Sequence, residues 1–244
     1  MHGGALPPEY ADEPERGGEA LPSDYDDRPE RFRTARSVLR RHALAADVHA
    51  QVARRFLDEG LTPVLDVGCG EGELARHLPD GGWVGVDSSP TMAAAAPGPV
   101  VQADATALPY ADGSFAALAL LYVLYHLPDP SKALAEAHRV LRPGGLLAAA
   151  APSRHDSHEL AHLLPAGPLI FDAELAPELI GERFHDLEIE RWDAPLLHLP
   201  ARRDVRDYLI GKGVEPGRAA EAAESVEVPL DVTKRGALVF GRRR

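Results

Sequence analysis

The sequence predicts an α/β domain built on a parallel β-sheet with helices on both faces, and three observations carry this prediction. Short apolar runs such as "PVLDVG" and "WVGVD" alternate along the chain with segments of helical spacing. The runs are apolar throughout, as in strands that are buried on both faces. Glycine, serine and proline residues separate the runs from the helices. Alternation of this kind is typical of a sheet covered by helices on each side.

The first elements are helical. Apolar residues recur at helical spacing over residues 29–59, and Gly60 is a plausible stop. We expect two helices here, with a break around residues 41–45. Residues 1–22 are rich in Gly, Pro and Glu and poor in aliphatic side chains. Because such a segment buries too little apolar surface to offset its ordering entropy, we expect a mobile tail.

The strands and helices that follow are read from the apolar runs and the helix-capping residues. Ser88 or Ser89 caps a short helix that has Pro90 in its first turn, and "RPGG" ends an amphipathic helix. Residues 185–193 alternate between apolar and polar, as exposed-edge or antiparallel strands do. We expect strands at 63–68, 83–87, 99–104, within 115–127, at 145–152, 185–193 and 237–243. We expect helices at 71–78, 89–96, 129–141, 172–182 and, as one or two helices, 202–225.

Composition bounds the class of protein. A chain of 244 residues suits one domain with appendages, and the formal net charge of −12 argues against a nucleic-acid partner. Cys69 is the single cysteine, so an intrachain disulfide is excluded. The sequence has no signal peptide at its start and no apolar run of about 18–20 residues. We therefore expect a cytoplasmic protein without a membrane partner, as a monomer or homodimer.

Three glycines and three acids point to the ligand site. Gly68, Gly70 and Gly72 follow the first strand as G-x-G-x-G, whereas a dinucleotide fingerprint reads G-x-G-x-x-G. Asp66 precedes the glycines, and the second and third strands end in Asp87 and Asp104. Ligands of parallel sheets bind outside the carboxyl ends of the strands, so the three acids are expected to line one crevice.

Several carboxylates would repel a pyrophosphate, which prefers amides and a helix N-terminus. S-adenosylmethionine suits them better, because it carries an ammonium, a sulfonium, a ribose diol and an adenine amine. We expect Asp66 near its amino acid part, Asp87 on the ribose and Asp104 near the adenine.

At this point the sequence resembles the class I S-adenosylmethionine-dependent methyltransferases, in particular the small-molecule branch that includes quinone-biosynthesis methyltransferases (methyltransferase type 11). The resemblance rests on "VLDVGCGEGELARHL", "WVGVDSSPTM", residues 102–152 and the terminal "KRGALVFGRR", and it is specific between residues 64 and 151. It implies a Rossmann-like seven-stranded, mostly parallel sheet with an antiparallel last strand. It also implies a single domain over 23–244, with core 60–151 plus the late strands and a helical cap from 23–59 and 152–225.

The resemblance assigns cofactor residues one by one. Gly68, Cys69 and Gly70 would run under the amino acid part, and Asp87 would hold both ribose hydroxyls. Leu121 or Tyr122 would approach the methionine part, and Tyr25 would cover the cofactor from the N-terminal helices. Further cofactor contacts would come from Ser88 and Met92 near the ribose, and from Asp104 and Ala105 at the adenine.

The acceptor side is less defined. His126 lies just past the fourth strand, where it would act as a general base or position the substrate. Tyr122, Arg154 and His155 are the expected substrate contacts. His155, His158 and His162 have near-helical spacing, but without a closed ligand set we expect a solvated or substrate-lining helix and no metal.

The expected function is methyl transfer from S-adenosylmethionine to an O, N or C nucleophile of a small molecule, with S-adenosylhomocysteine as product. Two alternatives remain open. One is a methyltransferase-fold protein that binds the cofactor without transferring a methyl group. The other is a nucleotide-dependent oxidoreductase, against which the glycine spacing and the three acids count.

Overall fold

A seven-stranded sheet forms the centre of the computed structural model, which describes residues 24–45, 47–165 and 169–244. The strand order is β3-β2-β1-β4-β5-β7-β6. β7 is antiparallel to both of its neighbours, while the pairings among β1 to β5 are parallel. The seven-stranded, mostly parallel sheet with an antiparallel last strand is thus confirmed. The strands are β1 (Val64–Val67), β2 (Trp83–Asp87), β3 (Val100–Gln102), β4 (Phe115–Leu121), β5 (Leu141–Pro152), β6 (His185–Leu199) and β7 (Leu230–Arg242).

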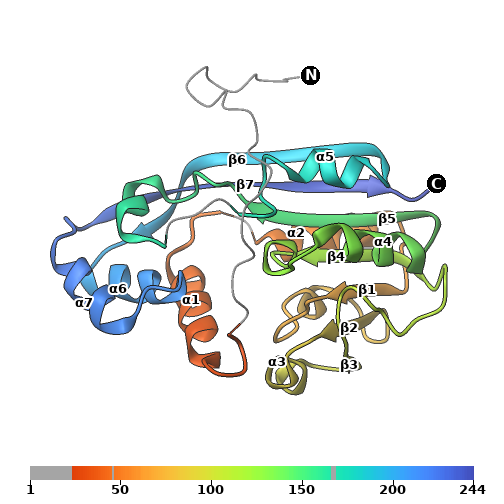
Figure 1. The fold of residues 1–244 in the computed structure, drawn as a ribbon, viewed down its shortest axis with the longest axis horizontal. Helices are drawn as coiled ribbons and strands as arrows, with labels where there is room; N and C mark the ends of the chain where they lie inside the picture. Colours follow the sequence, from red (N-terminus) through yellow and green to blue (C-terminus); the bar gives the residue numbers. More distant parts are fainter. Residues whose placement is uncertain (1–23, 46, 166–168) are drawn as a thin grey trace.

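The helices lie on both faces of the sheet and beyond one end of its strands. In Figure 1, α1, α6 and α7 group together at the end where the parallel strands finish, whereas α4 and α5 lie along the sheet. The helices are α1 (Pro29–His42), α2 (Val48–Asp58), α3 (Pro90–Ala95), α4 (Pro130–Val140), α5 (Ala176–Gly181), α6 (Arg202–Gly211) and α7 (Pro216–Glu224). Short 3-10 helices are η2 (Leu74–His77), η3 (Leu124–His126) and η4 (His158–Leu163). The segment 1–22, expected to be a mobile tail, lies outside the described residues.

Both faces of the sheet are packed, which explains the fully apolar strands. On β4, Leu118 and Leu120 belong to one buried cluster, and Ala117 and Ala119 belong to the cluster on the opposite face. Every residue of β4 is buried. A third apolar cluster, which includes Val205 and Leu209 of α6, lies beneath α6 and α7. The helices beyond the strand ends therefore have a core of their own.

The expected break between the first two helices is confirmed. The residues in this break pair with strand β6. Ala43 forms an isolated antiparallel bridge with Leu197, and the backbone N–H of Leu44 donates to the carbonyl of Leu196 at 2.8 Å. Because these residues hydrogen-bond to β6, they cannot continue α1 as a helix. Asp47 then caps α2 by accepting from the N–H of His49.

The helix expected at 71–78 is wrong, because only the short 3-10 helix η2 forms there. Gly70 and Gly72 have φ of +53° and +75°, outside the right-handed helical region. Pro79 disfavours a helix at its other end. A Cβ on Gly72 would lie 2.5 Å from Cδ of Pro97, so this glycine permits close packing of the segment after α3. Only one turn of helix fits between the two constraints.

Within the described ranges, no helix is both long enough and apolar enough to cross a membrane.

Candidate active site

The glycine turn joins the end of β1 to the end of β2. The N–H groups of Gly68 and Cys69 donate to the carbonyl of Val86 at 2.7 and 3.0 Å. Gly68 has a φ of +71°, and a Cβ on it would lie 2.4 Å from Cγ2 of Val123. A side chain at this position is therefore excluded both by conformation and by the chain that leaves β4. The turn is a fixed shelf at the point where the strand order reverses.

Asp87 lies at the centre of this shelf. One carboxylate oxygen accepts from the N–H of Gly70 at 2.8 Å, and the other accepts from the N–H of Ser89 at 2.9 Å. The side chain is buried, and burial raises its pKa while the two amide hydrogen bonds act in the opposite direction. A carboxylate offers about four acceptor positions. Two are used by the turn, so the rest can serve two hydroxyl groups of a ligand.

The neighbouring residues Ser88, Ser89 and Met92 are set by the start of α3. The hydroxyl of Ser89, and not that of Ser88, caps the helix by accepting from the N–H of Met92 at 3.1 Å. Ser88 is exposed next to Asp87 in the sequence, whereas Met92 is buried.

Asp66 is a buried acid behind the glycine turn. It accepts from the indole N–H of Trp83 at 3.2 Å. Burial raises the pKa of Asp66 to about 6, and nearby Asp87 adds to this effect, while His49 and the Trp83 hydrogen bond oppose it. A nearby cation would favour the ionised form. The carboxylates of Asp66 and Asp87 thus repel each other, and a positively charged ligand would reduce that repulsion.

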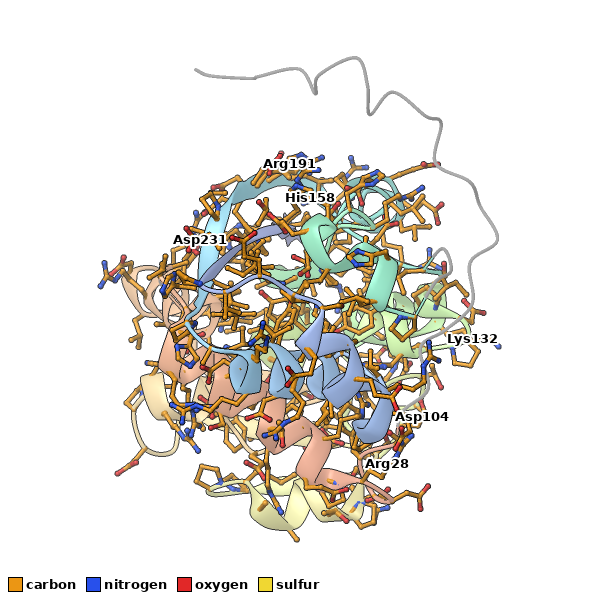
Figure 2. All side chains as sticks on the ribbon, turned by 90° about the vertical axis from the view of Figure 1, so that its left-hand side faces the viewer. Arg28, Asp104, Lys132, His158, Arg191 and Asp231 are labelled. Atoms are coloured by element: carbon orange, nitrogen blue, oxygen red, sulfur yellow. The ribbon has the colours of Figure 1, made fainter. Side chains whose placement is uncertain are left out.

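Asp104 stabilises the turn after β3, and its side chain is exposed to solvent. One of its oxygens accepts from the N–H and the hydroxyl of Thr106, at 2.7 and 2.8 Å, so it shapes the turn after β3. The side chain is exposed and lies near the outline of the molecule in Figure 2. The N–H of Ala103 donates to the carbonyl of Asp87 at 3.1 Å, which brings this turn beside the shelf. Ala105 is buried next to it.

The chain leaves β4 through a strained residue. Leu121 is buried, and Tyr122 has a φ of +63°, which is uncommon for a bulky side chain. Its N–H still donates to the carbonyl of Ala150 on β5 at 2.9 Å. The Tyr122 ring lies 6.4 Å from that of His49. Such strained residues cluster at functional sites, because the surrounding structure must hold them.

Aromatic side chains cover the glycine turn from the N-terminal side. The hydroxyl of Tyr25 lies 2.8 Å from Nε2 of His126, and the two rings meet edge-on. Tyr25 also packs edge-on against Phe32 of α1, whose ring lies 3.5 Å from where a Cβ of Gly70 would be. Burial raises the pKa of Tyr25 to about 12, so its hydroxyl stays protonated at neutral pH. Tyr25, Phe32 and His126 form an aromatic lid over the shelf.

Salt bridges fasten α1 to the glycine turn beneath this lid. Glu73 is buried and pairs with Arg36 and Arg40 of α1, and with Arg76 at 2.7 Å. Because α1 is tied to the turn itself, the lid and the shelf are positioned together.

Arg154 and His155 leave β5 in different environments. The Arg154 guanidinium pairs with the fully buried Asp172, with Nε at 2.8 Å and Nη2 at 2.7 Å. The N–H of His155 donates to the hydroxyl of Ser153 at 3.0 Å, and its side chain is exposed. The guanidinium of Arg154 is thus engaged in a structural ion pair.

Cys69 and the three histidines have ordinary environments. A Cβ on Gly85 would lie 2.7 Å from Sγ of Cys69, so the thiol is tightly packed, and burial raises its pKa well above the usual range. His155, His158 and His162 flank or lie within η4. In the part of the chain that the structure describes, no group of three or more His, Cys, Asp or Glu side chains is arranged to hold a metal ion.

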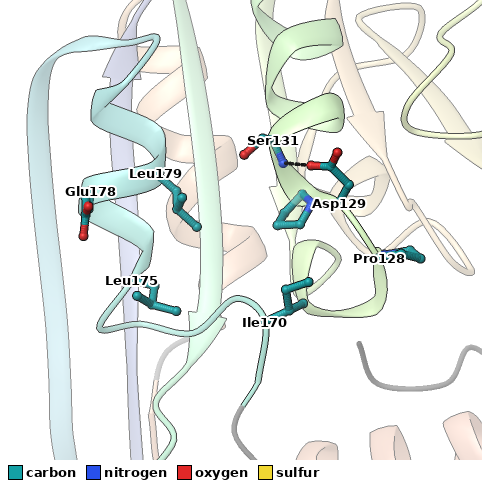
Figure 3. A pocket seen from close by; sticks show the side chains of 8 residues that line it. Pro128, Asp129, Ser131, Ile170, Leu175, Glu178 and Leu179 are labelled. Carbon is teal, nitrogen blue, oxygen red and sulfur yellow. Dashed lines mark hydrogen bonds between the residues drawn. The ribbon is translucent and has the colours of Figure 1, made fainter. Parts of the chain in front are cut away.

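A surface pocket lies apart from the shelf, between the start of α4 and α5 (Figure 3). Its lining includes Ile170, Leu175 and Leu179. Asp129 accepts from the N–H of Ser131 at 3.2 Å and so caps α4. The polar side chains of this pocket do not point toward a common position where a substrate could react. The glycine shelf under the aromatic lid is therefore the candidate site.

Three charged residues near the site escaped the sequence reasoning: Asp156, Lys212 and Lys234. The two lysines pair with Asp156, and the charges of Asp156 and Lys212 influence the pKa of the Tyr122 and Tyr125 hydroxyls after β4. Asp156 follows β5, and ligands of parallel sheets bind beyond the carboxyl ends of the strands. This position in the sequence could have identified Asp156 as a candidate site residue. Lys212 lies between two glycines after α6, and nothing in the sequence around it indicated a site residue.

Comparisons with known proteins agree with this geometry. Residues 65–149 match the family model described as "Methyltransferase domain". The chain is 36% identical over 151 residues to trans-aconitate 2-methyltransferase of Deinococcus radiodurans, covering 59% of this chain and 55% of that protein. It is 38% identical over 145 residues to malonyl-[acyl-carrier protein] O-methyltransferase of Dechloromonas aromatica, covering 52% and 53%. The chain thus spans about half the length of these curated relatives.

Solved structures share the architecture. The crystal structure of the [4+2]-cyclase SpnF superposes with a TM-score of 0.62 at 19% identity, covering 93% of this chain and 99% of that one. A likeness at this identity shows the fold alone, whereas the sequence matches show similarity to methyltransferases over part of the chain. Residues 65–149 therefore match a methyltransferase domain, and the chain as a whole has a Rossmann-like fold.

Proposed function

We propose that the chain is an S-adenosylmethionine-dependent methyltransferase that acts on an O, N or C nucleophile of a small molecule. The observation that carries the proposal is Asp87, which two backbone amides hold at the glycine turn with acceptor positions to spare. Such a carboxylate suits a ribose diol. The acidic pair of Asp66 and Asp87 suits a cationic ligand and disfavours a pyrophosphate, so the oxidoreductase alternative is not favoured.

The donor set fits the cofactor. Asp87 would hold the ribose hydroxyls beside Ser88 and Met92, and Asp66 would face the positively charged methionine part. Gly68, Cys69 and Gly70 would form the floor. Asp104 and Ala105 would border the adenine, Leu121 would border the methionine part, and Tyr25 would close the site from above.

The chemistry divides between cofactor and protein. Bound S-adenosylmethionine supplies a methyl group on a cationic sulfur, so that the acceptor's lone pair can form the new bond to carbon while the carbon–sulfur electrons remain on sulfur in S-adenosylhomocysteine. The protein's task is to align the acceptor and exclude water, and good alignment contributes up to about 7–11 kcal/mol. The aromatic lid and the salt bridges of Glu73 serve that task.

His126 is the group proposed to receive or orient the acceptor's proton. Its ring is positioned by the hydrogen bond with Tyr25 and by the tilted ring of Tyr125, 4.4 Å away between ring centres. A fixed imidazole at this position can accept a proton that the acceptor loses on methylation. Tyr122 at the strained exit of β4 would border the acceptor, together with the cap formed by 23–59 and 152–225.

The name of trans-aconitate 2-methyltransferase supports a small-molecule acceptor for this chain, and that of malonyl-[acyl-carrier protein] O-methyltransferase supports O-methylation. The test has two stages. Thermal-shift measurements would compare S-adenosylhomocysteine with NAD and NADP, since a ligand at 100 times its dissociation constant adds about 2.7 kcal/mol of stability. Stabilisation by NAD alone would overturn the proposal. Release of S-adenosylhomocysteine with candidate acceptors would then separate a methyltransferase from a protein that only binds the cofactor.

A further inference from the structure

Two lysines share one buried carboxylate at the acceptor side of the site. Asp156 accepts from Nζ of Lys212 at 2.9 Å and from Nζ of Lys234. Its other oxygen accepts from the N–H of Arg235 at 3.0 Å. The side chain of Asp156 is 7% exposed. Burial acts to raise its pKa, but the two ammonium groups outweigh burial and hold that pKa well below its usual range. The cluster of Asp156, Lys212 and Lys234 therefore carries one net positive charge.

Within the described residues, neither lysine forms an ion pair with a carboxylate other than Asp156. The side chain of Arg235 is itself a cation, and it pairs with Asp193 at 2.7 Å. Glu159 accepts from the N–H of Thr233 at 2.9 Å and faces His158 at 3.6 Å. A half-buried charge that no carboxylate neutralises destabilises the folded protein. A ligand anion that bound to this extra ammonium group would remove that cost.

The two lysines differ in the number of their partners. Lys234 donates to Asp156, to the hydroxyl of Ser157 at 3.1 Å and to that of Tyr208 at 2.9 Å, which uses all three of its N–H groups. Across the described residues, the Lys212 ammonium donates a hydrogen bond only to Asp156, and it lies 5.7 Å from the centre of the Tyr208 ring. The Lys212 side chain is 33% exposed, against 18% for Lys234. Lys212 thus has donors available to a ligand.

Lys212 also lies where the cap meets the acceptor side. Its charge acts on the hydroxyls of Tyr122 and Tyr125, the two tyrosines at the end of β4 and in η3. The preceding carbonyl, of Gly211, accepts from Nη1 of Arg31 on α1 at 3.2 Å. The charge of Lys212 thus acts on Tyr125, whose ring lies 4.4 Å from that of His126 at an interplanar angle of 50°.

We propose that Lys212, held in place by Asp156, binds a carboxylate group of the methyl acceptor. The proposal rests on the proposed methyltransferase function and names the acceptor's chemical class. One net positive charge matches a carboxylate, whereas a phosphate monoester carries about −1.5 to −2 and is commonly held by arginine forks. A small organic acid would place its charge on Lys212 and its nucleophile near His126.

The experiment uses the full chain saturated with S-adenosylhomocysteine. Titrations would compare trans-aconitate, glutarate and benzoate with their methyl esters and with phenyl phosphate. At least one free acid is expected to raise the melting temperature more than its ester does. Lys212→Met should weaken the binding of that acid roughly 10- to 100-fold, as loss of a charged hydrogen bond does, and Lys212→Arg should restore part of it.

Matched controls separate this proposal from the proposed function. Lys132 is 71% exposed on α4 and lies near the outline of the molecule in Figure 2, so Lys132→Met should change nothing. Lys212→Met keeps Asp156 paired with Lys234, so the variant should fold and keep its affinity for S-adenosylhomocysteine. If no acid binds better than its ester, if only the phosphate binds, or if Lys212→Met lowers cofactor and acid affinity alike, the carboxylate site is refuted. Absence of cofactor binding in the wild type would refute the function itself.

Discussion

The hydroxyl of Tyr25 reaches Nε2 of His126 at 2.8 Å across 101 residues of sequence. The contact joins the segment before α1 to the loop after β4, so it closes the lid over the glycine turn and orients the proposed proton acceptor in one step. In the tautomer with its proton on Nε2, His126 donates to the Tyr25 hydroxyl, which places the lone pair of the ring on Nδ1, the atom that would receive the acceptor's proton.

Tyr25→Phe is expected to separate these two roles. The ring keeps its edge-on packing against Phe32, so affinity for S-adenosylhomocysteine should stay within about threefold. The hydrogen bond to His126 is lost, so turnover should fall about 10-fold and the pH dependence of the rate should shift. Tyr25→Ala removes the cover as well and should weaken cofactor binding too. Equal turnover in Tyr25→Phe and the wild type would show that His126 needs no orientation by Tyr25.

Asp87→Ala should weaken S-adenosylhomocysteine roughly 10- to 100-fold, because hydrogen bonds to a charged group contribute about 1.5–3 kcal/mol. Isothermal titration calorimetry measures this directly. Asp80→Ala serves as the control, since Asp80 is exposed in the loop before β2. Asp87 also anchors the N–H groups of Gly70 and Ser89, so a melting curve of each variant is needed beside the titration. Unchanged affinity in a folded Asp87→Ala protein would contradict the ribose assignment.

Asp66 should make the stability of the cofactor-free protein depend on pH. Its folded pKa, about 6, lies above the ordinary value of about 3.9, so the native state binds the proton more tightly than the unfolded state. The resulting stabilisation is present below about pH 4 and is lost as the pH rises through 6. Two pKa units correspond to roughly 3 kcal/mol. Chemical denaturation from pH 4 to 7 should show this slope in the wild type.

Asp66→Asn should flatten that slope, and it should be the more stable protein at pH 7 without cofactor. S-adenosylmethionine, as a cation, should bind the wild type more tightly at pH 7 than at pH 5, with a smaller change for the neutral-sulfur product. A wild-type denaturation profile that matches Asp66→Asn at every pH would show that folding does not raise the pKa of Asp66.

The strands and the shelf could be predicted from the sequence because local signals agree with the global fold there. Buried strands such as β4 are apolar on both faces, and the glycines mark a turn that no other residue could adopt. The missing helix at 71–78 shows the limit of periodicity. The apolar spacing around Leu74 is helical, but the φ angles of Gly70 and Gly72, and the packing of Gly72 on Pro97, outweigh it.

The acceptor side could not be predicted because its residues meet only through the fold. Asp156 lies in the loop after β5, Lys212 directly after α6 and Lys234 on β7, and no short motif links them. Phe32 and His49 are likewise ordinary helical residues until α1 and α2 pack over the turn. The sequence does not show which group a charged residue will pair with. A residue that contacts the substrate therefore cannot be told from one that forms a structural ion pair.

Arg154 is the residue on which that ambiguity can be tested. Asp172 is fully buried, and Arg154 is its ion-pair partner, while two of the carboxylate's other bonds come from the N–H groups of Glu174 and Leu175. Removing one partner of a buried pair costs about 3–5 kcal/mol, because it leaves a charge without compensation. Arg154→Leu should therefore lower the free energy of unfolding by roughly that amount in urea denaturation. Arg203→Leu, on a side chain that is 76% exposed, should change it by less than about 0.5 kcal/mol.

The double variant Arg154→Leu with Asp172→Leu decides between the two roles of Arg154. If the arginine acts through the ion pair, replacing both partners by apolar side chains should recover much of the lost stability, since a buried pair is often no better than a packed apolar contact. Acceptor affinity should then recover with it. If Arg154 instead contacts the acceptor, the single variant should be nearly as stable as the wild type, and the double variant should keep a raised KM. Stability and KM measured on the same three proteins give the answer.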